Sequence, residues 1–347
     1  MSARRLYLDS AHGERRGVVT LDGRPERLLI QRDGDLPSQV LGARLVARVR
    51  SVNTAQNLAF LDLGEGPPGV LNLDPARERL AEGQSVEVEI RAEARHGKGA
   101  SVRVAGVAEG APRLLANAPT LAQRLQVYAG EGEIVTGGVA RAVADAAQEE
   151  ALQTVHAIAG GGSIAIEATR ALTAVDVDLG PGLGAQAKRA TRAANFAALA
   201  TAARVLRLKG LGGLVAIDLV GRGHDAPALL AAARIAFAPD NPGTVLAPIS
   251  RFGVLELTIP RRARPALDIL TDETGRLSAM SFGLALVRAI ERESTADRGG
   301  RFEVRAAEEV LDAARPALAQ LREVIGDRIV VTADASLARE AFEVARL

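Results

Sequence analysis

The amino-acid sequence predicts a multidomain α+β protein, and three features of its pattern support this fold class. Residues up to about 107 form short alternating stretches between turns rich in Gly, Pro and Asn, which is typical of β-structure. From about 120 to 265, strand-like runs alternate with Ala-rich helical stretches, as in a mixed α/β domain. Residues 276–347 alternate helices and strands again and predict a small α+β domain. The 347 residues suffice for two or three domains with a sizeable core.

The N-terminal strands predict a hairpin followed by a small barrel. Residues 5–31 alternate in strand fashion around a turn at Asp22-Gly23. Within residues 37–107 we expect five short strands, at 44–50, 58–63, 69–73, 85–92 and 100–104. An OB-fold is the closed barrel that best fits five strands in so short a stretch.

The remaining elements alternate in type. Residues 108–125 are rich in Ala, Leu and Pro and predict a connector or a short helix. For the central domain, 126–266, we expect helices at 138–156, 187–208 and 226–237 and strands at 163–168, 171–177 and 214–220. For the tail, 267–347, we expect helices at 279–293, 307–325 and 335–347 and strands at 301–305 and 328–332.

Composition excludes several classes of chemistry. Cys is absent, so disulfides, thiolate metal sites and cysteine nucleophiles are excluded. Lys and Arg total 43 against 42 Asp and Glu, and a net charge of +1 means that any basic surface for nucleic acid must be local. The N-terminus lacks the apolar core of a secretory signal, and no stretch approaches the roughly 18 apolar residues of a membrane span. We therefore expect a cytoplasmic protein without a membrane partner.

Three acidic residues lie on two strand-like runs of the central domain. Asp176 and Asp178 point to the same face of their strand because side chains alternate with a period of two. Asp218 lies in an apolar run, where a buried carboxylate must be paired or bind a metal. If the two strands are neighbours, the three carboxylates form an oxygen-only site suited to Mg²⁺ or Mn²⁺. The alternative, in which each Asp caps a helix or pairs with an Arg, stays open on the pattern alone.

Three ordered blocks of sequence resemble the ribonuclease E/G family. They are residues 161–167 (GGSIAIE) with 171–178 (ALTAVDVD), residues 206–218 (LRLKGLGGLVAID) after Asn195, and residues 249–257 (ISRFGVLEL). The resemblance implies an RNase H-like catalytic domain at 126–266, to which residues 1–36 also belong.

The resemblance also implies a reaction and its residues. Asp176 and Asp218 fall on the family's catalytic, metal-binding positions, and Asp178 on a supporting metal-binding position that is usually Asn. The implied activity is a magnesium-dependent endoribonuclease that acts on single-stranded RNA in rRNA or mRNA processing or decay. Its products would carry a 5′-phosphate and a 3′-hydroxyl.

The barrel resembles the S1-type RNA-binding module of that family. Residues 58–64 (LAFLDLG) and 93–100 (EARHGKGA) carry the likeness, which implies that Phe60 stacks on a base and Lys98 contacts phosphate. A core position for Phe60 is the alternative. A second aromatic position of the family falls on Val70, so we expect weaker stacking here.

Five further residues are candidates for RNA binding. Lys188, Arg189 and Arg192 share one helix face, which is either a phosphate track or an ordinary solvated face. Arg251 and Phe252 lie in the last of the resembling blocks, where the alternative is a buried Phe with a pairing Arg.

Departures from the family limit what the resemblance implies. Residues 108–125 are too few for its 5′-end sensor, and residues 267–275, without Cys, replace its zinc-binding cysteines. We therefore expect no 5′-end sensing and no zinc, and any homo-oligomer would not be zinc-linked. A rival reading is a non-catalytic RNA-binding protein that acts in rRNA maturation or binds AU-rich RNA. A metal hydrolase that does not act on nucleic acid would leave the barrel unexplained.

Overall fold

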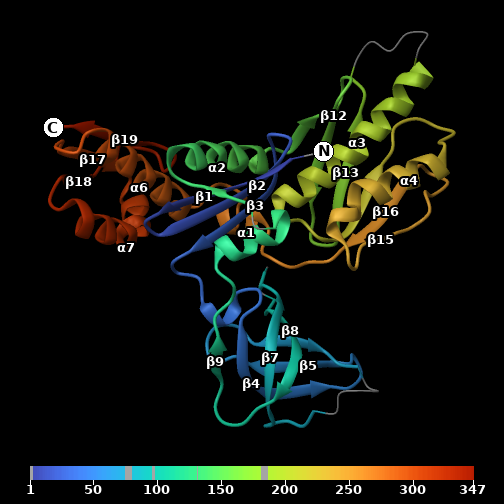
Figure 1. Ribbon diagram of the computed structural model, residues 1–347, viewed down its shortest axis with the longest axis horizontal. Helices are drawn as coiled ribbons and strands as arrows, with labels where there is room; N and C mark the ends of the chain where they lie inside the picture. Colours follow the sequence, from blue (N-terminus) through green and yellow to red (C-terminus); the bar gives the residue numbers. More distant parts are fainter. Residues whose placement is uncertain (1–2, 75–79, 96–97, 131, 181–186) are drawn as a thin grey trace.

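The structure is a computed structural model, and it describes residues 3–74, 80–95, 98–130, 132–180 and 187–347. It is a mixed α/β arrangement with the strands in separate sheets. Figure 1 shows the N-terminal sheet and helix α2 at the centre and the barrel below them. A second α/β unit lies on one side and the C-terminal unit on the other. No helix in these ranges is long and apolar enough to cross a membrane.

The N-terminal sheet has the order β10-β1-β2-β3. The strands are β1 (Arg4–Ala11), β2 (Glu14–Leu21), β3 (Arg24–Arg32) and β10 (Ile134–Val135). The predicted turn at Asp22-Gly23 is confirmed, and a second turn at Gly13 adds a third strand to the expected hairpin. Helix α2 (Gly137–Leu152) packs on this sheet through alanines at spacings of three and four residues. Small side chains on one helix face permit this close approach to the sheet.

The second sheet closes into a barrel because β4 pairs with both β5 and β7. Its strands are β4 (Arg44–Asn53), β5 (Leu58–Asp62), β6 (Gly69–Asn72), β7 (Ser85–Ala92) and β8 (Ser101–Val107). All five predicted strands are thus confirmed. A short 3₁₀ turn, η1 (Pro37–Gln39), leads into the barrel.

The connector at 108–125 contains more structure than expected. Strand β9 (Arg113–Ala116) pairs with β4 and adds to the barrel. The prediction that this part of the chain is only a connector or a helix was therefore wrong. Helix α1 (Leu121–Ala129) does begin in the connector, at a capping box formed by Thr120 and Gln123.

The third sheet has the order β11-β12-β13-β14-β16-β15. Its strands are β11 (Val155–Ala157), β12 (Ser163–Ala168), β13 (Thr173–Asp178), β14 (Gly213–Asp218), β15 (Val245–Leu246) and β16 (Val254–Ile259). The expected helix at 138–156 ends earlier, at Leu152, and its last residues form β11 instead. Helices α3 (Ala187–Lys209) and α4 (Ala226–Phe237, followed by the 3₁₀ turn η2, Ala238–Asp240) were both expected.

One face of this third sheet is apolar and the other is open. Val175, Val177, Val215 and Ile217 are buried in one core with residues of α3 and α4. The alternate residues of the same strands are exposed or half-buried, and we call their side the open face.

The C-terminal unit packs α6 (Ala279–Ala296) and α7 (Glu308–Ile325) on a sheet of order β18-β17-β19. The strands are β17 (Phe302–Ala306), β18 (Ile329–Ala333) and β19 (Phe342–Arg346), and a short helix, α5 (Ala266–Leu270), precedes the unit. The helix expected at 335–347 was wrong. β19 pairs along β17, and Phe342 and Val344 pack against the core, so tertiary contacts outweigh the helix propensity of this Ala-rich segment.

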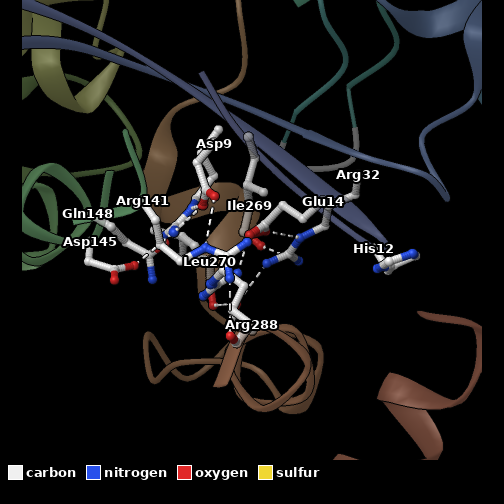
Figure 2. A network of polar contacts seen from close by, with 12 residues as sticks. Asp9, His12, Glu14, Arg32, Arg141, Asp145, Gln148, Ile269, Leu270 and Arg288 are labelled. Atoms are coloured by element: carbon white, nitrogen blue, oxygen red, sulfur yellow. Dashed lines mark hydrogen bonds and ion pairs between the residues drawn. The ribbon is translucent and has the colours of Figure 1, made fainter. Parts of the chain in front are cut away.

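A buried network of charges joins the N-terminal sheet to α2 and α6 (Figure 2). Arg16, 1% exposed, donates to Asp9 at 2.6 Å and to Asp145 at 2.7 Å. Arg288 of α6 donates to Glu14 at 2.8 Å. Because each of these charges has a partner of opposite sign, the cost of removing it from water is offset.

Candidate functional site

Asp176 and Asp218 are direct neighbours at the ends of two parallel strands. They are Cα partners in the register of β13 and β14. Both side chains lie on the open face, because their strand neighbours Val175, Val177 and Ile217 point into the apolar core. Neither carboxylate forms an ion pair or hydrogen bond with the residues that the structure describes. Two unengaged carboxylates therefore face solvent side by side.

The expectation that Asp218 is buried in an apolar run was wrong. Asp218 is exposed, while Ile217 and Leu219 on either side of it are buried. Alternation along the strand separates the carboxylate from the apolar side chains that flank it in sequence. Burial therefore gives no reason for Asp218 to need a cation. What supports a metal site is that Asp218 lies next to Asp176.

Asp178 shares the open face but has a hydrogen bond of its own. It is two residues beyond Asp176, and its Oδ1 accepts from the Gly180 amide at 2.9 Å. Among the described residues, no group of three or more His, Asp or Glu side chains is placed to hold a metal ion. A two-carboxylate set still fits Mg²⁺, which keeps several waters and commonly uses one or two carboxylates.

Asn195 of α3 holds the segment that follows Asp218. Its side chain is 1% exposed, accepts from the Val220 amide at 3.1 Å and donates to the Val220 carbonyl at 3.0 Å. The Leu219 amide donates to the Gly253 carbonyl at 3.2 Å. The chain leaving Asp218 is thus fixed to a helix on one side and to the turn before β16 on the other.

That turn presents an exposed aromatic ring beside the carboxylates. Phe252 is 76% exposed, and the guanidinium of Arg251 lies 4.6 Å from the centre of its ring. Ser250 Oγ accepts from the amides of Phe252 and Val254, and Val254 is the register partner of Asp218. The buried-Phe alternative was therefore wrong, and a stacking surface with a cation lies next to the pair.

The predicted basic face of α3 begins near the same edge. Gly221 approaches Thr191 so closely that an added Cβ would lie 2.7 Å from it, so the first turns of α3 lie beside the segment after Asp218. Arg189 is exposed. Arg192, also exposed, forms an ion pair with Asp225 at 2.9 Å. The side chain of Lys188 lies outside the described residues.

The barrel residues lie away from the carboxylates. Phe60 is half-buried on the outer side of β5, opposite Val70, and does not belong to the barrel core, so the core alternative was wrong. Lys98 is exposed. It precedes Gly99, where an added Cβ would lie 1.6 Å from the Pro68 carbonyl, which fixes this loop beside β6. The structure thus gathers one group at the carboxylates and another on the barrel.

Sequence reasoning missed a carboxylate and a set of arginines. Glu256 is exposed on the open face, as the partner of Ala216 in β14, and the alternation of 254–259 could have identified it. Arg261 and Arg262 belong to a short basic run, RRAR at 261–264, that could have identified them, whereas only the docking of the barrel brings Arg95 to this run.

Comparison with known proteins places this geometry in context. Residues 108–262 match the Ribonuclease E/G family. Ribonuclease E of Haemophilus influenzae is 28% identical over 244 residues, which cover 66% of this chain and 26% of that relative. Ribonuclease E of Escherichia coli is 29% identical over 187 residues, or 51% of this chain and 17% of the relative. A chloroplastic ribonuclease E/G-like protein of Arabidopsis thaliana is 29% identical over 135 residues, or 35% and 13%. The matched residues thus span only a minor part of each relative's length.

Proposed function

Because the chain belongs to the ribonuclease E/G family, we propose that it is a divalent-metal-dependent endoribonuclease acting on single-stranded RNA. The observation that carries this proposal is the in-register pair Asp176 and Asp218, which is exposed and free of ion pairs among the described residues. The exposed Phe252 and Arg251 next to it supply the surface on which a base and a phosphate would lie.

Asp176 and Asp218 would hold Mg²⁺, or Mn²⁺ in its place, through their carboxylate oxygens. Asp178 would join as a third ligand after its side chain turns from the Gly180 amide. When bound, the ion activates a water and neutralises charge on the phosphate. A zinc link through thiolates is excluded, since the chain has no Cys.

The protein's own residues position the strand. Phe252 would stack on a base next to the scissile phosphate while Arg251 contacts a phosphate oxygen. Arg189, Arg192 and Lys188 extend the positive charge along α3. Attack of water on phosphorus, with departure of the 3′ oxygen, leaves a 5′-phosphate and a 3′-hydroxyl.

The fold assignments belong to the same proposal. The closed barrel at 37–107 is an S1-type OB-fold, and residues 126–266 with 1–36 form an RNase H-like catalytic domain. Residues 108–125 link the two while adding β9 to the barrel and beginning α1, and 267–347 form a small C-terminal domain. In this arrangement Phe60 and Lys98 bind the substrate on the barrel, and the protein acts in the cytoplasm in rRNA or mRNA processing or decay.

A non-catalytic RNA-binding protein is the second candidate. It is favoured by the lack, within the described ranges, of a three-residue group placed to bind metal. The same RNA surfaces would then act alone, in rRNA maturation or on AU-rich RNA.

Cleavage of an unstructured A/U-rich RNA separates the two candidates. The wild-type protein should cut it with Mg²⁺ and stop in excess chelator, and Asp218→Asn should lose at least a hundredfold in rate. Asp327→Asn is the matched control, because Asp327 is exposed in the turn between α7 and β18 of the C-terminal unit. Cleavage that persists in Asp218→Asn or in chelator would rule out the metal mechanism. Binding without cleavage by the wild type would favour the second candidate.

A further inference from the structure

The barrel is fixed to the third sheet's unit by Glu93. Its amide donates to the Arg262 carbonyl at 2.8 Å. Its carboxylate accepts from the amides of Arg264 at 2.9 Å and Leu41 at 3.2 Å. Residues 93–95 of the barrel therefore lie against the segment 260–265 that leaves β16.

Three arginines at this junction, Arg95, Arg261 and Arg262, form no ion pair with the residues that the structure describes. Arg261 donates to the Gly212 carbonyl at 3.0 Å, and Arg262 donates to the Pro242 carbonyl at 3.4 Å. Neither of them, nor Arg95, forms an ion pair with any described residue, whereas Arg264 nearby is paired with Asp35. Arg261 and Arg262 are exposed and Arg95 is half-buried. The junction thus offers guanidinium groups that are available to an anion.

Two of these arginines affect each other electrostatically. The pKa of Arg95 is lowered first by burial and then by the charge of Arg261, while Asp268 acts in the opposite direction. A bound anion would reduce the repulsion between these like charges. Arginine pairs with phosphate through two parallel N–H donors, which suits it to this role.

Arg95 connects the arginines of the junction to the barrel's candidate RNA-binding residues, Phe60 and Lys98. Arg95 and Lys98 are antiparallel bridge partners, so their side chains project to the same side. Lys98 lies three residues before Ser101, which pairs with Val70, the partner of Phe60.

From the junction, strand β16 leads back toward the carboxylate pair. Arg261 lies two residues beyond Ile259, the partner of Gly213, and Asp218 is five residues further along β14. At roughly 3.3 Å per residue, the seven residues from Arg261 back to Val254, the partner of Asp218, span about 23 Å.

From this placement we propose that Arg95, Arg261 and Arg262 form a phosphate track. It would guide single-stranded RNA from the barrel face at Phe60 and Lys98 toward Asp176 and Asp218. The inference rests on the proposed function, since it names how the same substrate reaches the same site. A strand of RNA fits better than an acidic protein segment, because the arginines adjoin a barrel that carries the candidate stacking residue Phe60 and the candidate phosphate contact Lys98.

The test measures binding of a labelled 20-nucleotide oligouridylate as a function of salt, without divalent ions and in an Asp218→Asn background. Replacing all three arginines by Gln should reduce the slope of log K against log salt by about 2, at roughly 0.7 per phosphate contact on single strands. At 0.1 M salt this corresponds to a loss of affinity on the order of a hundredfold. A four-nucleotide oligouridylate, which reaches only the barrel, should bind the variant and the parent alike.

Matched variants separate the outcomes. Arg103→Gln is the control, because Arg103 pairs with Glu89 on the barrel surface, and its slope should stay unchanged. Lysines at all three positions should restore most of the slope, which a mere folding defect would not allow. If the Gln variant keeps the parent slope while Phe60→Ala and Lys98→Ala weaken binding, the track is wrong and the proposed function stands. If the parent protein does not bind the 20-mer at all, both fail. If the variant instead loses binding to an acidic peptide and not to RNA, the partner class is wrong.

Discussion

Asn195→Leu tests how the segment after Asp218 is held in place. Leucine has a similar volume but neither donates nor accepts, so both hydrogen bonds to Val220 are lost. Each such bond contributes about 1 kcal/mol net, and a buried amide or carbonyl left unpaired costs about 1–3 kcal/mol. Val220 is half-buried, so water can satisfy part of this loss. We therefore expect the free energy of unfolding to fall by about 2–3 kcal/mol.

Urea unfolding followed by circular dichroism measures this loss, and hydrogen exchange measures its location. The Val220 and Leu219 amides should exchange faster in the variant, since both lie in the segment that Asn195 and Gly253 hold. RNA cleavage at saturating substrate should slow at least tenfold at a temperature where the variant is folded, because Asp218 would lose its fixed surroundings.

Asn117→Leu is the control, since Asn117 is exposed and should tolerate the same replacement with a change below about 0.5 kcal/mol. An Asn195→Leu protein with wild-type stability and unchanged exchange at Val220 would refute the reasoning, whatever its activity.

Two further predictions concern buried charges. Arg16→Met leaves Asp9, 3% exposed, with Arg141 as its one remaining ion-pair partner among the described residues. The change should cost about 3–5 kcal/mol in urea unfolding at pH 7. Burial raises the pKa of Asp9, but hydrogen bonds and charge from Arg16 and Arg141 outweigh it and hold that pKa below its usual value. The wild-type protein thus loses the stabilisation from the Asp9 carboxylate as pH falls through the folded-state pKa of Asp9. The difference in free energy of unfolding between wild type and Arg16→Met should therefore shrink toward pH 3. A difference that stays constant would contradict the role given to Asp9. Burial lowers the pKa of Lys209 from 10.5 to about 8. Between these two pH values the unfolded chain binds more protons than the folded protein, so raising the pH favours folding. The free energy of unfolding of the wild type, relative to that of Lys209→Met, should therefore rise between pH 8 and 10.5. A flat difference over that range would contradict it.

The candidate site was predicted from sequence in part. Asp176 and Asp178 had to share a face because they are two residues apart in a strand. That Asp218 lies opposite Asp176 was expected only if their strands were neighbours, and the parallel pairing of β13 with β14 provides this. The burial of Asp218 was mispredicted because its apolar neighbours in sequence were taken as its neighbours in space.

Local pattern also failed where a free strand edge decided the structure. Residues 335–347 have the composition of a helix, and β19 forms because β17 offers an edge and the core offers space for Phe342 and Val344. Strand β9 likewise depends on the edge of β4, which lies far from it in sequence. Such pairings are long-range contacts that no window of sequence contains.

The sequence by itself determined the periodic features: most strands and helices, the shared face of Asp176 and Asp178, and the absence of thiolate chemistry. Alternation and composition are local or global properties of the chain, so they need no fold. The tertiary structure decided which side chains meet or reach solvent. It placed Asp218 beside Asp176, turned Phe252 and Phe60 outward, and brought Arg95 within electrostatic reach of Arg261. Those contacts join residues far apart in the chain, and only strand pairing and the docking of the barrel bring them within reach of one another.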